Sequence, residues 1–231
     1  MTPIQIIKNC ENLVYESLPQ MLTRRYEITY KPDGSPVTTA DVLLENIIKN
    51  YLVSQIANLN FIGEESFDFA WQKNTGYLAI LDPIDGTENF CSGLKEWGVS
   101  LCLWYGQEHL ASMLLMPELR ECIKTGDQIK PIYSRITGFS SSYNELIGEG
   151  IKESIEYRVT GCAVYNLFNV IRGSFARFIN PKGAYVWDLL PGIMLASEHG
   201  CQILLNDEPY QGQLLDSTQK YRVDIRHVYS L

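Results

Sequence analysis

The amino-acid sequence predicts a mixed α/β fold in which amphipathic helices and short strands alternate irregularly. Apolar residues recur at helical spacing over residues 3–23 and 41–56, whereas the apolar runs at 76–82 and 97–104 are rich in strand-forming residues. The order of these segments lacks the regular βαβ alternation of a dinucleotide-binding sheet. We therefore expect an α/β mixture with a different topology.

Composition limits the possible classes of protein. The 231 residues, 45% of them hydrophobic, suit one large domain or two lobes that share a core. A formal net charge of -8 argues against nucleic-acid binding, which depends on clustered Lys and Arg. The acidic total is still compatible with an acidic metal site.

The cysteines and the N-terminal residues indicate a cytoplasmic protein. The six cysteines are scattered, without the spacings of a metal-binding or disulfide framework, so we expect reduced thiols. Lys8, Glu11 and Glu16 interrupt the apolar runs near the N-terminus, so neither a signal-peptide core nor a membrane span fits there. We expect no membrane partner and no nucleic-acid partner.

The N-terminal elements follow from spacing and turn chemistry. A helix is expected over 3–23, with Pro3 in its first turn and a kink at Pro19. Pro and Gly residues at 32–36 favour a reversal between two short extended pieces. The second helix begins near Asp41, behind a capping threonine at position 38 or 39.

The remaining elements are shorter. The polar, turn-prone stretch from 117 to 145 is interpreted as a hinge, which divides the chain into an N-terminal lobe, 1–130, and a C-terminal lobe, 131–231. Extended segments are expected at 59–63, 76–82, 97–104, 109–116, 174–180 and 201–205, and helices at 163–173 and 188–200.

The segment LDPIDGTENF, residues 81–90, carries the strongest chemical signal. It follows an apolar strand, and Pro83 restricts the chain so that Asp82, Asp85 and the Ile84 carbonyl could converge on one hard cation. If a helix begins at Gly86 and Thr87, its backbone N–H groups could hold a phosphate. A turn with solvated carboxylates is the alternative for this segment alone.

Two further acidic segments could meet the first one. Glu64 and Glu65 follow the apolar strand at 59–63, so they could reach the same sheet edge as Asp82, although an exposed acidic loop is the alternative. Asp188 follows Trp187 at the start of an expected helix, where capping alone would explain it. Only the combination of the segments favours a metal site.

In combination, the motifs give the chain a specific resemblance to the inositol monophosphatase superfamily of lithium-sensitive, magnesium-dependent phosphatases. The resemblance covers most of residues 1–212. It rests on KPDGSPVTTAD at 31–41, GEES at 63–66, DPIDGTENF at 82–90, GCA at 161–163 and WDLLPG at 187–192.

The resemblance implies a layered αβαβα sandwich and a hydrolase that uses two or three Mg²⁺ ions. The implied reaction is attack on a small phosphate monoester by a metal-activated water. The implied metal ligands are Glu64, Asp82, the Ile84 carbonyl, Asp85 and Asp188.

The resemblance also implies roles for residues around the metal. Asp41 and Thr87 would orient and deprotonate the water, and Glu64 would act with them as a catalytic residue. The phosphate and the rest of the substrate would contact Gly86, Thr87, Gly161, Cys162, Ala163, Lys31 and Lys182. The three histidines are interpreted as structural or surface groups.

The sequence departs from the family pattern at one substrate position and in length. Inositol-preferring members carry a Glu where this chain has Pro181, followed by Lys182, so we expect a different hydroxyl pattern or a second anionic group on the substrate. The chain also lacks part of the segment after 116–118 and the final helix of the family. We expect catalysis to survive while the contacts of a homodimer or the stability differ.

Three functions therefore remain open. The first is hydrolysis of an inositol-phosphate-like, sugar or polyol phosphate. A second is a 3'(2'),5'-bisphosphate nucleotidase, favoured if Lys182, Arg158 or Arg172 meets a second phosphate. The third is a non-enzymatic regulatory homologue, because a fold alone does not fix a function.

Overall fold

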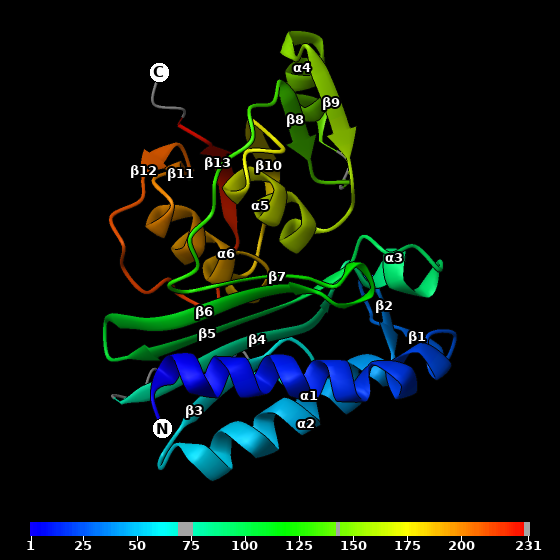
Figure 1. The fold of residues 1–231 in the computed structure, drawn as a ribbon. Coiled ribbons are helices and arrows are strands. Elements are labelled where there is room, and N and C mark those ends of the chain that lie inside the picture. The colour runs from blue at the N-terminus through cyan, green and yellow to red at the C-terminus, as the bar shows by residue number, and fades with distance from the viewer. Residues whose placement is uncertain (69–75, 142–143, 229–231) are drawn as a thin grey trace.

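The computed structural model describes residues 1–68, 76–141 and 144–228. The described residues form five layers, two of which are sheets (Figure 1). Helices α1 (Pro3–Thr23) and α2 (Thr39–Gln55) cover one face of the first sheet. Helices α5 (Ala163–Ile171) and α6 (Val186–Glu198) separate that sheet from the second one. The layer order matches the expected αβαβα sandwich.

The N-terminal layer follows the apolar spacing of the sequence. Thr2 caps α1 by accepting a hydrogen bond from the Gln5 backbone N–H at 3.2 Å, and the helix continues through Pro19 to Thr23. Ile7, Val14 and Met21, seven residues apart, are buried on its inner face. Strands β1 (Ile28–Tyr30) and β2 (Pro36–Thr38) form the expected hairpin before α2.

The first sheet has the order β3-β4-β5-β6-β7. Strand β3 runs parallel to β4, and the other neighbours are antiparallel. Nearly every residue of its central strands is buried, because helices cover both faces. The strands are β3 (Asn60–Gly63), β4 (Tyr77–Asp85), β5 (Gly98–Tyr105), β6 (Glu108–Met116) and β7 (Glu121–Lys124).

The second sheet has the order β12-β11-β13-β10-β8-β9. Helix α4 (Glu145–Glu153) lies against its outer side, where Gly150 approaches the Phe139 ring. The strands are β8 (Ile136–Phe139), β9 (Glu156–Val159), β10 (Arg177–Ala184), β11 (Gln202–Leu205), β12 (Glu208–Pro209) and β13 (Tyr221–Arg226).

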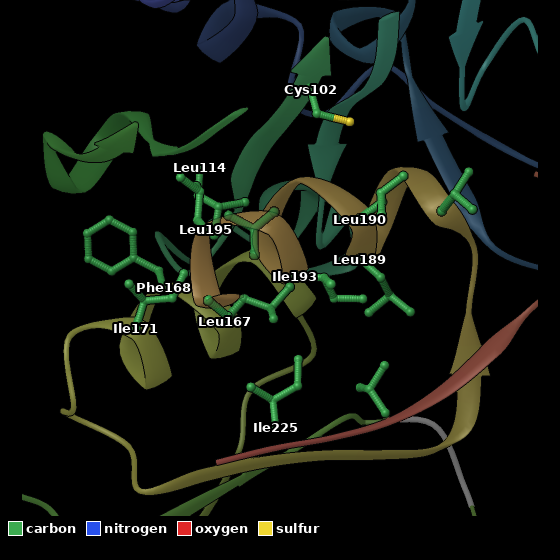
Figure 2. Close-up of a cluster of buried hydrophobic side chains, with 14 of the residues drawn as sticks. Cys102, Leu114, Leu167, Phe168, Ile171, Leu189, Leu190, Ile193, Leu195 and Ile225 are labelled. Carbon is green, nitrogen blue, oxygen red and sulfur yellow. The ribbon is translucent and has the colours of Figure 1, made fainter. Parts of the chain in front are cut away.

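The largest core cluster lies between the two sheets (Figure 2). Cys102 and Leu114 enter it from the first sheet, and Ile225 enters it from β13 of the second. Leu167 of α5 and Ile193 of α6 fill the space between them. Because α6 contacts both sheets, this cluster fixes the position of the first turn of α6.

Two segments differ from the sequence-based expectation. The stretch 117–145, expected to be a hinge, contains the short helix η1 (Pro117–Leu119), strand β7 and strand β8. These strands have four residues each, too few to show a clear pattern in a polar setting. The final segment, for which no element was expected, contributes β13 between β10 and β11. Among the described residues, no helix is long and apolar enough to cross a membrane.

Truncation of Ile193 should destabilise the fold by about 3 kcal/mol, because Ile193→Ala leaves a cavity in fully buried packing. Ile4→Ala on α1 is the matched control, since Ile4 is 49% exposed, and its effect should stay within about 0.5 kcal/mol. Urea unfolding measures both values. Equal effects of the two variants would contradict this account of the core.

Candidate functional site

The strand pairing brings the first two acidic segments together. Strands β3 and β4 are parallel, and Gly63 pairs with Leu81, so Glu64 and Asp82 follow side by side at the same sheet edge. The Glu64 backbone N–H donates to the Leu81 carbonyl at 3.2 Å. A side chain at Gly63 would meet the Glu45 carboxylate at 2.4 Å, so this close approach requires a glycine.

The third acid, Asp188, reaches this edge through a link between α6 and the sheet. Ser100 of β5 pairs with Asp82, and its hydroxyl donates to the Trp187 carbonyl. The Asp188 carboxylate accepts the Tyr185 backbone N–H at 2.8 Å, which also caps α6. As a result, oxygens of Glu64, Asp82 and Asp188 lie within 4.8 Å of one another.

This three-carboxylate cluster is electrostatically costly without a cation. Burial, followed by the charges of Glu64 and Asp85, raises the pKa of Asp82 and of Asp188 well above the usual value for aspartate. One oxygen of Asp82, Oδ1, accepts the Ile84 backbone N–H at 3.0 Å. The other, Oδ2, is buried and has no hydrogen-bond partner among the residues that the structure describes. An unpartnered buried oxygen within a group of carboxylates fits a hard divalent cation.

Asp85 lies at the end of β4, beside the cluster but outside the group of three. Its Oδ2 accepts hydrogen bonds from the Cys162 thiol, at 3.0 Å, and from the Val164 backbone N–H. Burial raises the pKa of Asp85 to about 6, although these two hydrogen bonds oppose the shift. The carboxylate therefore ties the end of β4 to the first turn of α5, and Asp85 also lines the cavity described below.

Asp41 and Thr87 are in contact although 46 residues separate them. Thr38 caps α2 and donates both its backbone N–H and its hydroxyl to Asp41 Oδ2. The other oxygen, Asp41 Oδ1, lies 3.3 Å from Thr87 Oγ1, which is also 2.9 Å from the Ile84 carbonyl. Burial raises the pKa of Asp41 to about 6. Because a hydroxyl has one proton, Thr87 can donate to only one of these two acceptors at a time.

Lys31 pairs with the acids of the GEES segment. Its Nζ lies 2.8 Å from Glu64 and 3.0 Å from Glu65. Burial alone would lower the pKa of Lys31, but the two carboxylates raise it above its usual value. Burial, with the charge of Glu64, raises the pKa of Glu65 to about 7. In this arrangement the ammonium group offsets part of the negative charge beside the cluster.

Two glycines allow the loops to close over the site. Gly86 has φ +81°, and a Cβ there would lie 2.9 Å from the Cys162 Cβ. Gly161 has φ +72° in the loop before α5. Asn89 donates to the carbonyls of Glu96 and Thr160 at 2.7 Å each, so it holds the segment after Asp85 against that loop.

These elements surround a cavity of about 520 Å³. Asp41, Asp82 and Ile84 are buried and do not line the cavity, and Lys182 is exposed and does not line it either. The residues from the sequence-based set that line it are Lys31, Glu64, Asp85, Gly86, Thr87, Gly161, Cys162, Ala163 and Asp188.

Sequence reasoning missed several residues of the cavity wall. Tyr185, Asn180 and Ser140 line the cavity, and so does Lys220, which precedes β13. In the sequence, Lys220 belongs to a polar turn, and nothing in that pattern indicates that the residue reaches the cavity. The pairing of Tyr221 with Ala184 brings Lys220 to the cavity, and this contact is visible only in the folded chain.

Comparisons with known proteins bear on the family to which the chain belongs. The model of the inositol monophosphatase family matches residues 3–154. The bifunctional phosphatase IMPL2 of Arabidopsis thaliana is 28% identical over 106 residues, which are 46% of this chain and 31% of that protein. The 3'(2'),5'-bisphosphate nucleotidase CysQ of Haemophilus influenzae is 22% identical over 224 residues, covering 85% of this chain and 83% of the relative.

Solved structures show the same fold. An IMPase/NADP phosphatase complexed with Mg²⁺ and phosphate superposes with a TM-score of 0.79 at 19% identity, covering 96% of this chain and 89% of that one. At this identity the likeness concerns the fold. The family match over more than half of the chain confirms the resemblance that the motifs indicate, and the chain belongs to the inositol monophosphatase family of phosphatases.

Proposed function

We propose that the protein hydrolyses a small phosphate monoester with the help of Mg²⁺. The observation that carries this proposal is the unpartnered, buried Asp82 oxygen within the three-carboxylate cluster. Glu64, Asp82 and Asp188 would hold one ion, and Asp85 with the Ile84 carbonyl would complete the binding of two or three. The relative solved with Mg²⁺ and phosphate supports the choice of metal.

The residues around the metal site supply proton transfer and positioning. When bound, magnesium would stabilise negative charge on the phosphoryl oxygens and lower the pKa of a water molecule. If the Ile84 carbonyl becomes a metal ligand, Asp41 is left as the acceptor for the Thr87 proton. The lone pairs of Thr87 Oγ1 can then accept a proton from the attacking water. Thr38 holds Asp41 in place for this step through two hydrogen bonds.

The phosphate would lie beside Gly86 and Thr87, with Gly161, Cys162 and Ala163 on the substrate side and Lys31 next to Glu64. All six line the cavity, which supports their assignment as binding residues. Lys182 has no such support. Pro181 lies on the outer side of the second sheet, in a depression that residues of α4 also line. The position of the family glutamate therefore does not belong to this cavity. A preference for myo-inositol phosphate is therefore not part of the proposal.

A bisphosphate nucleotidase is the second candidate within this class, and the similarity to the Haemophilus relative favours it. The basic residues that we expected at a second phosphate do not support it. Arg158 pairs with Glu156 and Arg172 with Glu121, and neither these arginines nor Lys182 lines the cavity.

Replacement of Asp82 should separate catalysis from folding. Asp82→Asn should reduce magnesium-dependent phosphate release at least about 10³-fold, because the ion loses a charged ligand. In EDTA at pH 8 the variant should melt at a higher temperature than the wild type, since a neutral amide replaces a buried carboxyl group whose ionised form is disfavoured by burial and by the charges of Glu64 and Asp85. Asp207→Asn on the exposed β11–β12 turn is the control. Phosphate release with and without Mg²⁺ and Li⁺ measures activity, and near-normal turnover by Asp82→Asn would refute the metal site.

The pH dependence of stability should differ between the metal-free and the Mg²⁺-bound protein. The folded-state pKa of Asp41 and Asp85 is raised to about 6, above the unfolded value near ~3.9, so the fold favours their protonated forms. In EDTA the melting temperature should therefore fall as the pH rises from about 4 to about 6, the range between the unfolded and the folded pKa values. With Mg²⁺ this decline should shrink or reverse, because the ion binds the ionised carboxylates. Parallel slopes in EDTA and Mg²⁺ would contradict the assignment.

Replacement of Thr87 should lower the turnover rate more than it weakens the binding of Mg²⁺. Thr87→Val should lower kcat about 10²-fold, because the path for the water proton is lost, while the Mg²⁺ activation constant changes less than about threefold. Thr87→Ser retains the hydroxyl and should keep most of the activity. Titration of activity with Mg²⁺ gives both constants. A loss explained entirely by weaker Mg²⁺ activation would make Thr87 a metal-site residue instead.

A further inference from the structure

The basic side chains of the cavity differ in whether they form ion pairs with acidic residues. Among the described residues, Lys31 and Lys220 are the lysines that line it, and no described arginine does. Lys31 is shared between Glu64 and Glu65. For Lys220, no ion pair with a described acid is present. Its charge is therefore available to a ligand.

Aromatic stacking holds Lys220 at the rim of the cavity. Its Nζ lies 4.7 Å from the centre of the Tyr185 ring, a cation–π contact. Tyr185 also stacks on Trp187, with ring centroids 4.7 Å apart and an interplanar angle of 26°. Because the Tyr185 backbone N–H also binds Asp188, the residue that supports Lys220 is fixed to the three-carboxylate cluster.

An irregularity of β10 brings further polar groups to the same wall. The pairing of β10 with β13 shifts register between Asn180 and Ala184, and Gly183 there has φ +87°. Asn180 Oδ1 accepts the Gly183 backbone N–H at 3.0 Å and the Ser140 hydroxyl at 3.2 Å. Since this fixes the oxygen as the acceptor, the Nδ2 group of Asn180 is a further donor in a residue that lines the cavity.

The charge distribution then favours a particular class of substrate. The reacting phosphate would bind at the metal end, while further carboxylates in the cavity wall, Asp33 and Glu88, would repel any other anionic group. We propose that Lys220, supported by Tyr185, forms a subsite for a second anionic group, a phosphate or a carboxylate, of the substrate. The preferred substrates are then phosphate monoesters with two anionic groups. This inference rests on the proposed phosphatase function and deepens it.

Three matched pairs of substrates test the subsite. They are glycerol 2-phosphate with 2-phosphoglycerate, fructose 1-phosphate with fructose 1,6-bisphosphate, and adenosine 3'-monophosphate with adenosine 3',5'-bisphosphate. For the preferred doubly anionic probe, Lys220→Met should raise KM about tenfold with kcat within about twofold, because one charge-assisted contact is lost. KM for its singly anionic partner should change less than about twofold. Lys220→Arg should restore most of the binding.

Lys152→Met is the control, because it removes the same charge as Lys220→Met from a residue of α4 that lies outside the cavity. The subsite is overturned if Lys220→Met changes KM equally within every pair, changes it in none, or matches Lys152→Met. Failure of the wild type to hydrolyse any of the six probes would instead refute the proposed phosphatase function. In that case calorimetric titration of the three doubly anionic probes, with Mg²⁺ present, decides the subsite, and equal Kd values for wild type and Lys220→Met would overturn it.

Discussion

The burial of several carboxylates at one sheet edge is the constraint on which the rest of the structure depends. Asp82 is fully buried, and within the described part of the chain only one of its two oxygens has a hydrogen-bond partner. An uncompensated buried charge costs on the order of several kcal/mol, so the surrounding core must hold these acids together without a cation. The close packing of α6 between the two sheets supplies that stability, and this packing also carries Asp188 to the site.

The cluster depends on links between elements that are distant in the sequence. Ser100 both pairs with Asp82 across the sheet and binds the Trp187 carbonyl, so one residue connects the ends of β4 and α6. Asp85 makes the corresponding connection to α5 through Cys162 and Val164. Because these residues lie on strands and helices, their carboxylates need little rearrangement to meet an ion. A change at Ser100 would therefore disturb the three-carboxylate cluster although Ser100 contributes no carboxylate to it.

The sequence predicted those parts of the fold and site that depend on local signals. The apolar run before Asp82 and the threonine before Asp41 specify a buried strand and a capped helix, and both lie where the pattern indicates. The positions of β8 and β13 could not be predicted, since each depends on pairing with β10 across a long stretch of chain. For the same reason Lys182 was expected in the cavity and Lys220 was not. The irregular turn at Gly183, where the pairing of β10 with β13 shifts register, leaves Lys182 outside the cavity and Lys220 in its wall.

The arrangement of charge also links metal binding to substrate binding. Without an ion, Glu64, Asp85 and Asp188 face the cavity, and among the described residues Lys31 and Lys220 are the basic side chains of its wall that oppose them. A phosphate would meet net negative charge at the point where it must react, so the field of the site opposes its entry. A bound divalent ion would offset part of this negative charge at the carboxylate end, while Lys220 would attract an anion at the rim. Under the proposed function, the same ion that supplies the chemistry therefore also makes the cavity able to accept its substrate.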